Sequence, residues 1–185
     1  MGKRPLSAAV FLDRDGVINR ITVSKGVPHP PQELKEFSFL PKVPKACRDL
    51  RRAGLALVVV TNQPDVARGT QTRKRVRAMN ERVASRLPVK GVLTCFHDNA
   101  DACLCRKPKP GLLKKAAARW RLDLKRSFIV GDRWSDIAAG RAAGCRGILI
   151  KKSYSQAERC RPDWTARDLA EAAEIILRTI KHEIE

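Results

Sequence analysis

The stretch Ala8-Ala9-Val10-Phe11-Leu12-Asp13-Arg14-Asp15-Gly16 joins a short uncharged run to an acidic turn. Such a run, ending abruptly in acidic residues and glycine, is typical of a buried parallel strand. In open α/β sheets, ligands bind outside the carboxyl ends of the strands. There, one carboxylate of Asp13 and Asp15 can attack a substrate while the other exchanges protons or helps to hold a metal. A capped turn is the alternative interpretation, because aspartate and glycine are common in turns.

Length and charge limit the class of protein. A chain of 185 residues, 43% hydrophobic, suits one domain with its own core, spanning 1–185. Its 38 Lys and Arg against 19 Asp and Glu give a net charge of +19, which favours anionic partners such as phosphorylated metabolites, nucleic acid or acidic surfaces. A basic, solvated exterior explains the same charge without any partner.

Targeting features are absent from the sequence as it stands. The start Met1-Gly2-Lys3-Arg4-Pro5 leads directly into the first strand, and Leu6 occupies the position where myristoylation prefers Ser or Thr. No apolar run approaches the roughly 20 residues that span a bilayer. We therefore expect a cytoplasmic protein without a membrane partner, whose six cysteines are thiols or metal ligands rather than disulfides.

Apolar runs and amphipathic stretches alternate along the whole chain. This alternation predicts an α/β fold, a doubly wound parallel sheet with right-handed crossovers. The residues from Gly26 to Pro31 predict an extended loop, and the segment 151–164 is expected to be irregular. The predicted strands are 8–12, 55–60, 91–95, 127–130 and 146–150, and the predicted helices are 41–52, 72–87, 111–121, 134–143 and 168–182.

Polar residues follow three more of the predicted strands. Thr61, Asn62 and Gln63 end the second strand, where a hydroxyl and an amide suit hydrogen bonds to phosphate oxygens. Asp132 and Asp136 follow the fourth strand, and carboxylates at two strand ends can hold Mg²⁺. The predicted helix 72–87 carries a basic face that lacks interleaved aromatic residues, so a solvated surface is favoured there over a nucleic-acid groove.

Four potential metal ligands lie within eleven residues of one loop. Cys95, His97, Cys103 and Cys105 form a Cys3His set, a standard tetrahedral arrangement for structural Zn²⁺. Unrelated cysteines in a polar loop are the alternative. Arg106 and Lys107 follow directly and are fixed by the prolines after them, so a guanidinium and an ammonium can together neutralise a phosphate. Together with the carboxylates, this is the equipment for phosphoryl transfer through an aspartyl-phosphate.

The order Asp-x-Asp-Gly, Thr-Asn-Gln, Arg-Lys-Pro, Gly-Asp-x-x-x-Asp resembles the haloacid dehalogenase (HAD) superfamily of phosphatases. The stretch from Phe11 to Asn19, the cysteine loop and Val60-Thr61-Asn62-Gln63 resemble its narrower group of heptose-bisphosphate and histidinol phosphatases. The resemblance covers about residues 8–150. It implies a Rossmann-like sheet of about five to six strands, a zinc-stabilised loop, and a minimal cap made of small loop insertions.

The resemblance also implies roles for individual residues. Asp13 would be the nucleophile and Asp15 the general acid and then base, with Mg²⁺ held by Asp13, Asp132 and the backbone carbonyl of Asp15. Asp136 would support them. Thr61, Arg106 and Lys107 would hold the transferring phosphoryl group; Asn62, Gln63 and Arg133 would also face the substrate; Cys95, His97, Cys103 and Cys105 would bind Zn²⁺.

Several substrates fit this resemblance. The expected reaction is removal of the C7 phosphate from D-glycero-D-manno-heptose 1,7-bisphosphate, on the route to nucleotide-activated heptose, by a monomeric enzyme. Pro64-Asp65 departs from the Ser-Gly that heptose enzymes usually carry, so histidinol phosphate is an alternative. The net charge keeps a polynucleotide end phosphatase open as a further hypothesis. A non-enzymatic binding module stabilised by zinc is another, although the pair of Asp13 and Asp15 and Lys107 argue against it.

Overall fold

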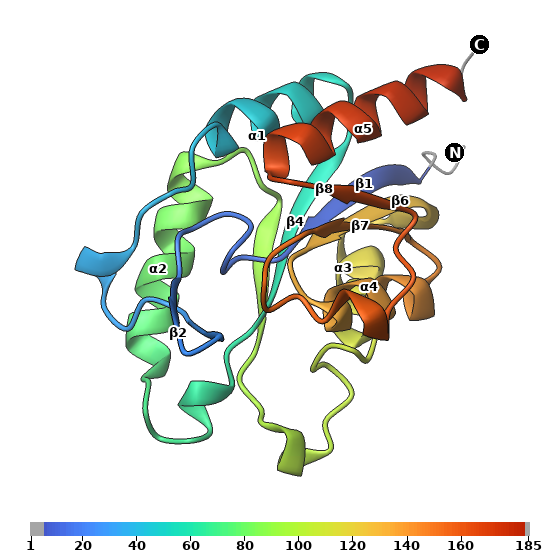
Figure 1. Ribbon diagram of the computed structural model, residues 1–185. Helices are drawn as coiled ribbons and strands as arrows, with labels where there is room; N and C mark the ends of the chain where they lie inside the picture. Colours follow the sequence, from blue (N-terminus) through green and yellow to red (C-terminus); the bar gives the residue numbers. More distant parts are fainter. Residues whose placement is uncertain (1–5, 184–185) are drawn as a thin grey trace.

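The computed structural model describes residues 6–183, so the start Met1–Pro5, on which part of the cytoplasmic expectation rested, lies outside the described residues. One parallel sheet forms the centre of the fold (Figure 1). Its order is β5-β4-β1-β6-β7-β8, as expected for a doubly wound sheet. The strands are β1 (Ser7–Leu12), β4 (Ala56–Asn62), β5 (Gly91–Cys95), β6 (Leu122–Gly131), β7 (Arg146–Ile150) and β8 (Trp164–Ala166).

Strand β1 lies between the two halves of the sheet. The chain runs from β1 outward through β4 and β5, then returns to β6 and continues through β7 and β8, so the strand order reverses between β1 and β6. Leu12 pairs with Val59 on one side and with Val130 on the other. The carboxyl ends of these three strands therefore lie at the same edge of the sheet, which is where ligands bind in such folds.

Helices cover both faces of the sheet (Figure 1). Helices α1 (Val43–Arg52), α2 (Arg73–Arg86) and α5 (Leu169–His182) pack on one face, in a core that includes Leu12 and Met79. Helices α3 (Gly111–Trp120) and α4 (Trp134–Ala143) pack on the other face, around Phe11. No helix among the described residues is long and apolar enough to cross a membrane.

The sequence-based boundaries hold for most elements, with three differences. Strand β6 begins at Leu122, five residues earlier than predicted. Its pairing with β1 shifts register between Ala8 and Val10, and Ser127 bridges this shift by accepting from Ala9 N and donating to Asp123 O. The segment expected to be irregular, 151–164, leads into a short strand that was not predicted, β8, whose first residue Trp164 packs against Phe128. The expected extended loop is instead a hairpin of β2 (Thr22–Ser24) and β3 (Val27–His29).

Side chains and glycines define the helix ends. The Thr72 hydroxyl accepts from Arg75 N at the start of α2, and the Asp168 carboxylate accepts from Glu171 N at the start of α5. Gly144 ends α4 with a φ of +89°, a conformation that glycine adopts without strain. Short 3-10 turns complete the described chain at Leu34–Glu36, Pro64–Val66, Asn99–Asp101 and Ala157–Arg159.

Replacement of the cap of α5 tests this account of the fold. Asp168→Ala removes the acceptor for Glu171 N, and we expect a loss of about 1 kcal/mol in the free energy of unfolding. Urea denaturation measures the loss, with Glu174→Ala, an exposed position on the same helix, as the control. Equal stability of Asp168→Ala and the control would contradict the assignment of the cap.

Candidate active site

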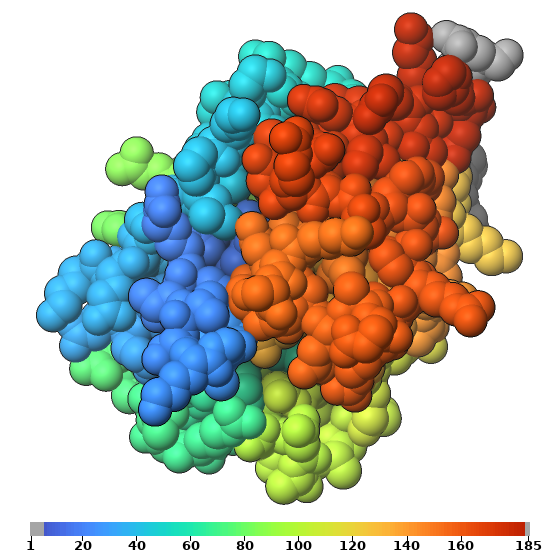
Figure 2. Space-filling view, in the orientation of Figure 1, coloured from blue at the N-terminus to red at the C-terminus, as the bar shows by residue number. Residues whose placement is uncertain are grey.

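A cavity of about 630 Å³ opens at the carboxyl edge of the sheet. In Figure 2, the blue segments near the N-terminus meet the orange segments, and the green and yellow-green segments lie below them. The residues that line the cavity come from these parts of the chain. Hairpin β2–β3 contributes Val27 and Pro28, and the loop between β7 and β8 contributes Tyr154. The predicted site residues among its lining are Asp13, Asp15, Asn62, Gln63, Arg106, Lys107, Arg133 and Asp136.

Three buried carboxylates meet one buried ammonium at this edge. Oxygens of Asp13, Asp132 and Asp136 all lie within 4.8 Å of one another. Lys107 Nζ lies 2.7 Å from Asp13 Oδ1 and 2.5 Å from Asp136 Oδ1, and it donates to the carbonyl of Val60 at 2.8 Å. When all four groups are ionised, the cluster carries two negative charges in excess.

Burial shifts the protonation of this cluster. It raises the pKa of Asp13 to about 6, although Lys107 pulls that pKa down. It raises the pKa of Asp132 to about 8, with the charges of Asp13 and Asp136 adding to the effect. Burial opposes the charged form of Lys107, yet the pKa of Lys107 lies above its usual range because Asp13 and Asp136 face it. Full ionisation of the cluster, with its two excess negative charges, is therefore disfavoured unless a cation balances them.

The acidic cluster fits a hard divalent cation. Asp132 Oδ1 is buried and has no hydrogen-bond partner among the described residues, while Asp132 Oδ2 accepts from the Tyr154 hydroxyl at 2.7 Å. An unpartnered carboxylate oxygen among excess negative charge is the environment that Mg²⁺ neutralises. Gly16 allows this approach, because a Cβ there would lie 2.0 Å from Asp132 Oδ2. Tyr154 was missed by sequence reasoning, since it stands in a segment without a recognisable motif.

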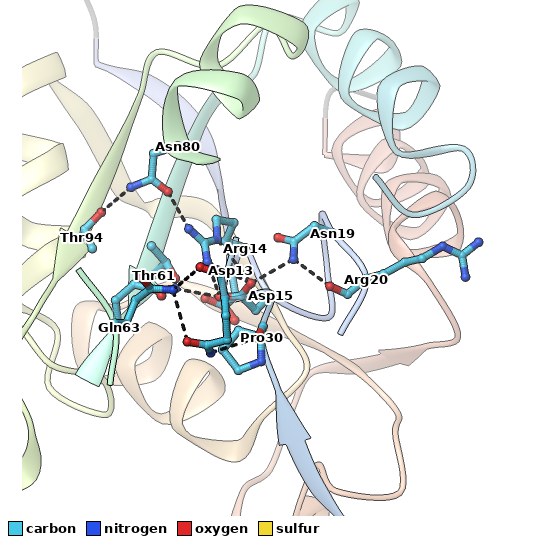
Figure 3. Close-up of polar contacts among 12 residues, drawn as sticks. Asp13, Arg14, Asp15, Asn19, Arg20, Pro30, Thr61, Gln63, Asn80 and Thr94 are labelled. Carbon is cyan, nitrogen blue, oxygen red and sulfur yellow. Dashed lines mark hydrogen bonds and ion pairs between the residues drawn. The ribbon is translucent and has the colours of Figure 1, made fainter. Parts of the chain in front are cut away.

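The Asp15 carboxylate belongs to a second network (Figure 3). It accepts from Gln63 Nε2 at 2.7 Å, from Asn19 Nδ2 at 2.9 Å and from Arg14 Nη2 at 2.9 Å. Sequence reasoning did not assign Arg14 or Asn19. The sequence does show a basic residue between two aspartates at the end of a buried strand. A buried positive charge at that position needs a counter-ion, so a partner for Arg14 could have been predicted.

The three polar residues that end β4 differ in what they contact. Thr61 is buried and accepts from Gln63 Nε2 at 2.9 Å, and it does not line the cavity. Asn62 exchanges two hydrogen bonds with the backbone of Lys107, at 3.1 Å and 3.2 Å, which fixes the start of the lysine loop. Gln63 lies between Thr61 and Asp15, where its amide joins the two.

Arginines add positive charge around the cavity. Arg106 donates to Asn99 Oδ1 at 2.7 Å, and Arg133 is exposed at the start of α4. Arg68, which was not predicted as a site residue, binds the Asp98 carboxylate with two hydrogen bonds of 2.7 Å and 2.8 Å. All three arginines line the cavity.

The cysteine loop brings its four predicted ligands together. Cys105 Sγ lies 3.2 Å from Cys95 Sγ and 3.5 Å from Cys103 Sγ, and His97 Nδ1 lies 3.3 Å from Cys105 Sγ. All four ligand atoms lie within 4.8 Å of one another. Three sulfurs and one imidazole nitrogen at these separations fit tetrahedral Zn²⁺ with every position filled by protein.

Known proteins share this sequence and fold. A family model described as HAD-hydrolase-like matches residues 104–172. A D-glycero-β-D-manno-heptose-1,7-bisphosphate 7-phosphatase from Yersinia pestis is 34% identical, over 91% of this chain and 94% of its own. The chain belongs to the heptose-bisphosphate phosphatase family of HAD hydrolases. Its members include an α-anomer 7-phosphatase from Photorhabdus laumondii, 33% identical over 80% of this chain and 85% of its own.

A solved structure of the family has the same architecture. The D,D-heptose 1,7-bisphosphate phosphatase from B. bronchiseptica, complexed with magnesium and phosphate, is 31% identical. It aligns with a TM-score of 0.79 over 93% of this chain and 99% of its own. The fold class, the resemblance and the phosphatase activity predicted from the sequence are therefore confirmed.

The acidic cluster predicts how stability depends on pH when Mg²⁺ is absent. Because the pKa values of Asp13 and Asp132 are raised to about 6 and about 8, the folded protein binds more protons than the unfolded chain at neutral pH. We expect the melting temperature to fall as pH rises from about 5 to about 8, and saturating Mg²⁺ to remove much of this fall.

Thermal scans across pH measure this dependence in protein dialysed free of Mg²⁺. Asp132→Asn should flatten the curve, whereas Asp49→Asn, on α1 away from the cluster, should leave it unchanged. A melting temperature of the wild type that rises over the same range would contradict the proposed charge balance.

Metal analysis tests the cysteine cluster. We expect zinc in the purified wild type, and a loss of most of it in Cys105→Ser, because oxygen replaces the thiolate that contacts the other three ligands. Cys160→Ser is the control, since Cys160 lies outside the cluster and should leave the zinc content unchanged. Wild-type protein without zinc would contradict the assignment.

Proposed function

We propose that the chain removes the C7 phosphate of D-glycero-D-manno-heptose 1,7-bisphosphate, in the synthesis of nucleotide-activated heptose for surface glycans. The observation that carries this proposal is the contact of Lys107 Nζ with Asp13 Oδ1 beside a cation-deficient acidic cluster. Phosphoryl transfer requires a nucleophile beside positive charge at one end of a cavity, so this contact supports the proposal. The heptose substrate rests on the names of the relatives.

The first chemical step forms a bond between Asp13 and phosphorus. An Asp13 carboxylate oxygen attacks, the bond from phosphorus to the C7 oxygen breaks, and Asp15 gives its proton to that leaving oxygen. Asp13 is itself negative, and at 4 Å its repulsion by a single charge is about 4 kcal/mol at an effective dielectric constant of 20. Lys107 offsets this repulsion, and Mg²⁺, held by Asp13, Asp132 and the Asp15 carbonyl, supplies further positive charge when bound.

The second step releases phosphate. Water attacks the phosphorus of the aspartyl-phosphate, the bond to Asp13 breaks, and the Asp15 carboxylate accepts the proton of the water. Asp136 supports the site by contacting the same Lys107 ammonium that contacts Asp13. Thr61, Asn62 and Gln63 position the phosphoryl group and the groups around it.

The charge of the cavity suits a bisphosphate. Arg106 and Arg133 line it in addition to Lys107, so a second phosphate can be bound by a guanidinium fork while the first is attacked. The relatives include enzymes named for the β anomer and for the α anomer, and the assay therefore uses both. We further propose that residues 1–185 act as one domain and as a monomer in the cytoplasm, where the six cysteines stay reduced.

Loss of the nucleophile tests the proposed reaction. We expect Asp13→Asn to lower kcat for phosphate release from the heptose bisphosphate by about 10³-fold or more, because an amide cannot form the phosphoryl intermediate. Asp49→Asn is the control and should keep wild-type activity. Wild-type activity in Asp13→Asn would contradict the mechanism.

A panel of substrates tests the proposed specificity under matched Mg²⁺. The panel holds both heptose bisphosphates, histidinol phosphate and a 3′-phosphorylated oligonucleotide. A kcat/KM for either heptose ester that exceeds those of the other substrates supports the proposal. A preference for histidinol phosphate or for the oligonucleotide would replace it with the corresponding alternative.

A further inference from the structure

Arg14 is the largest fully buried side chain among the described residues, with none of its surface exposed. It follows Asp13 directly and precedes Asp15, at the end of the central strand. Its guanidinium contacts the Asp15 carboxylate and Asn80, and Figure 3 shows both contacts. A buried charge of this kind costs free energy through desolvation, and its pairing is weak evidence for a role in stability. Another role needs to be considered.

The guanidinium holds both oxygens of Asp15. Arg14 Nη2 lies 3.0 Å from Asp15 Oδ1 and 2.9 Å from Asp15 Oδ2, and Arg14 Nε lies 3.3 Å from Oδ1. A planar fork that contacts both oxygens fixes the rotation of a carboxylate as well as its position. A lysine cannot do this, because its ammonium is a point charge on a flexible stem.

Two further elements of the fold hold the guanidinium. Arg14 Nη1 donates to Asn80 Oδ1 at 2.9 Å, and Asn80 Nδ2 donates to Thr94 Oγ1 at 3.0 Å. Asn80 lies on α2 and Thr94 on β5. The Asn80 amide is therefore oriented from both sides, with its oxygen toward Arg14 and its nitrogen toward Thr94. This chain of contacts reaches Asp15 from behind the cavity, since neither Asn80 nor Thr94 lines it.

The remaining donors to Asp15 lie on different sides. Asn19, which is fully buried, donates to Oδ1, and Gln63, which lines the cavity, donates to Oδ2. A carboxylate has about four acceptor positions, and these contacts occupy them. Gln63 Nε2 also donates to Thr61 Oγ1, so it keeps a partner when it leaves Asp15. Oδ2 is therefore the oxygen whose cavity-side donor, Gln63, can give way to a substrate, while Arg14 and Asn19 keep the carboxylate in place.

We propose that Arg14, oriented by Asn80, is a positioning residue that aims Asp15 Oδ2 at the leaving oxygen of the substrate. The inference rests on the proton-transfer role proposed for Asp15 above. It gives a role to Arg14, the residue between the two aspartates. It also gives a role to the hydrogen bond between Arg14 and Asn80 of α2, which lies outside the cavity.

Leaving groups of different basicity separate positioning from folding. An alkyl phosphate needs a proton on its departing oxygen, whereas p-nitrophenyl phosphate releases a stable phenolate without one. General acid–base catalysis contributes about 10²- to 10⁴-fold. Asp15 also accepts the water proton in the second step for every ester, so the first step is measured alone, as ester cleavage in rapid-quench single turnovers with excess enzyme. We expect Arg14→Lys to lower the cleavage rate of the sugar phosphate by about 10-fold or more, and that of p-nitrophenyl phosphate by less than about 3-fold.

Asn80→Ala provides a milder variant that leaves the buried charge in place. It should shift the ratio of the two cleavage rates in the same direction as Arg14→Lys, by a smaller factor. Arg77→Ala, an exposed position on the same helix, is the control and should leave the ratio at the wild-type value. The sugar phosphate is the heptose bisphosphate, or whichever alkyl ester of the substrate panel the wild type hydrolyses.

The outcomes distinguish this inference from the proposed function. A wild type that prefers another alkyl ester changes the proposed substrate, and the ratio measured with that ester still tests Arg14. Parallel losses on both esters in Asn80→Ala, or an unchanged ratio in both variants, would overturn the positioning role while leaving the phosphatase assignment intact.

Discussion

The buried ammonium of Lys107 is the group on which the site depends. It contacts Asp13 and Asp136 and has almost no exposed surface, and it also donates a hydrogen bond to the backbone carbonyl of Val60. Without it, three neighbouring carboxylates would be buried with no positive charge, an arrangement that water-free surroundings strongly disfavour. With it, the cluster still lacks positive charge. That deficit is what a divalent cation and a phosphate together can balance, the metal at the carboxylates and the phosphate at the lysine.

The sheet places these groups with little freedom. Asp13 N donates to Val130 O at 3.0 Å, so the first residue after β1 is hydrogen-bonded to the carboxyl end of β6. Asp132 follows β6 directly, and Gly16 lets its carboxylate approach the end of β1, because a Cβ at Gly16 would collide with Asp132 Oδ2. Lys107 lies on a loop that Asn62 binds to the end of β4 and that directly follows Cys105 of the cysteine cluster. Rigid elements thus hold every charge of the cluster.

The sequence predicted those parts of the site that follow from strand ends and from local spacing. Lys107 and Asp13 are 94 residues apart, and their proximity was expected because both belong to motifs at one edge of a parallel sheet. Their direct ion pair was not predicted. The Cys3His cluster followed from spacing alone. Arg14 with Asn80 and Asp132 with Tyr154 were not predicted, because each pair joins a motif to a residue in a helix or loop that carries no motif. Such partners are set by tertiary packing, which composition and periodicity do not report.

Trapping the phosphoryl group on the enzyme tests the central claim most directly. Enzyme mixed with excess heptose bisphosphate and Mg²⁺ is quenched in acid during turnover, digested, and its peptides are analysed by mass spectrometry. The account predicts a phosphoryl group on the peptide that contains Asp13, and its absence from the same peptide of Asp13→Asn. Turnover with no phosphorylated peptide, or with the phosphoryl group on another residue, would contradict it.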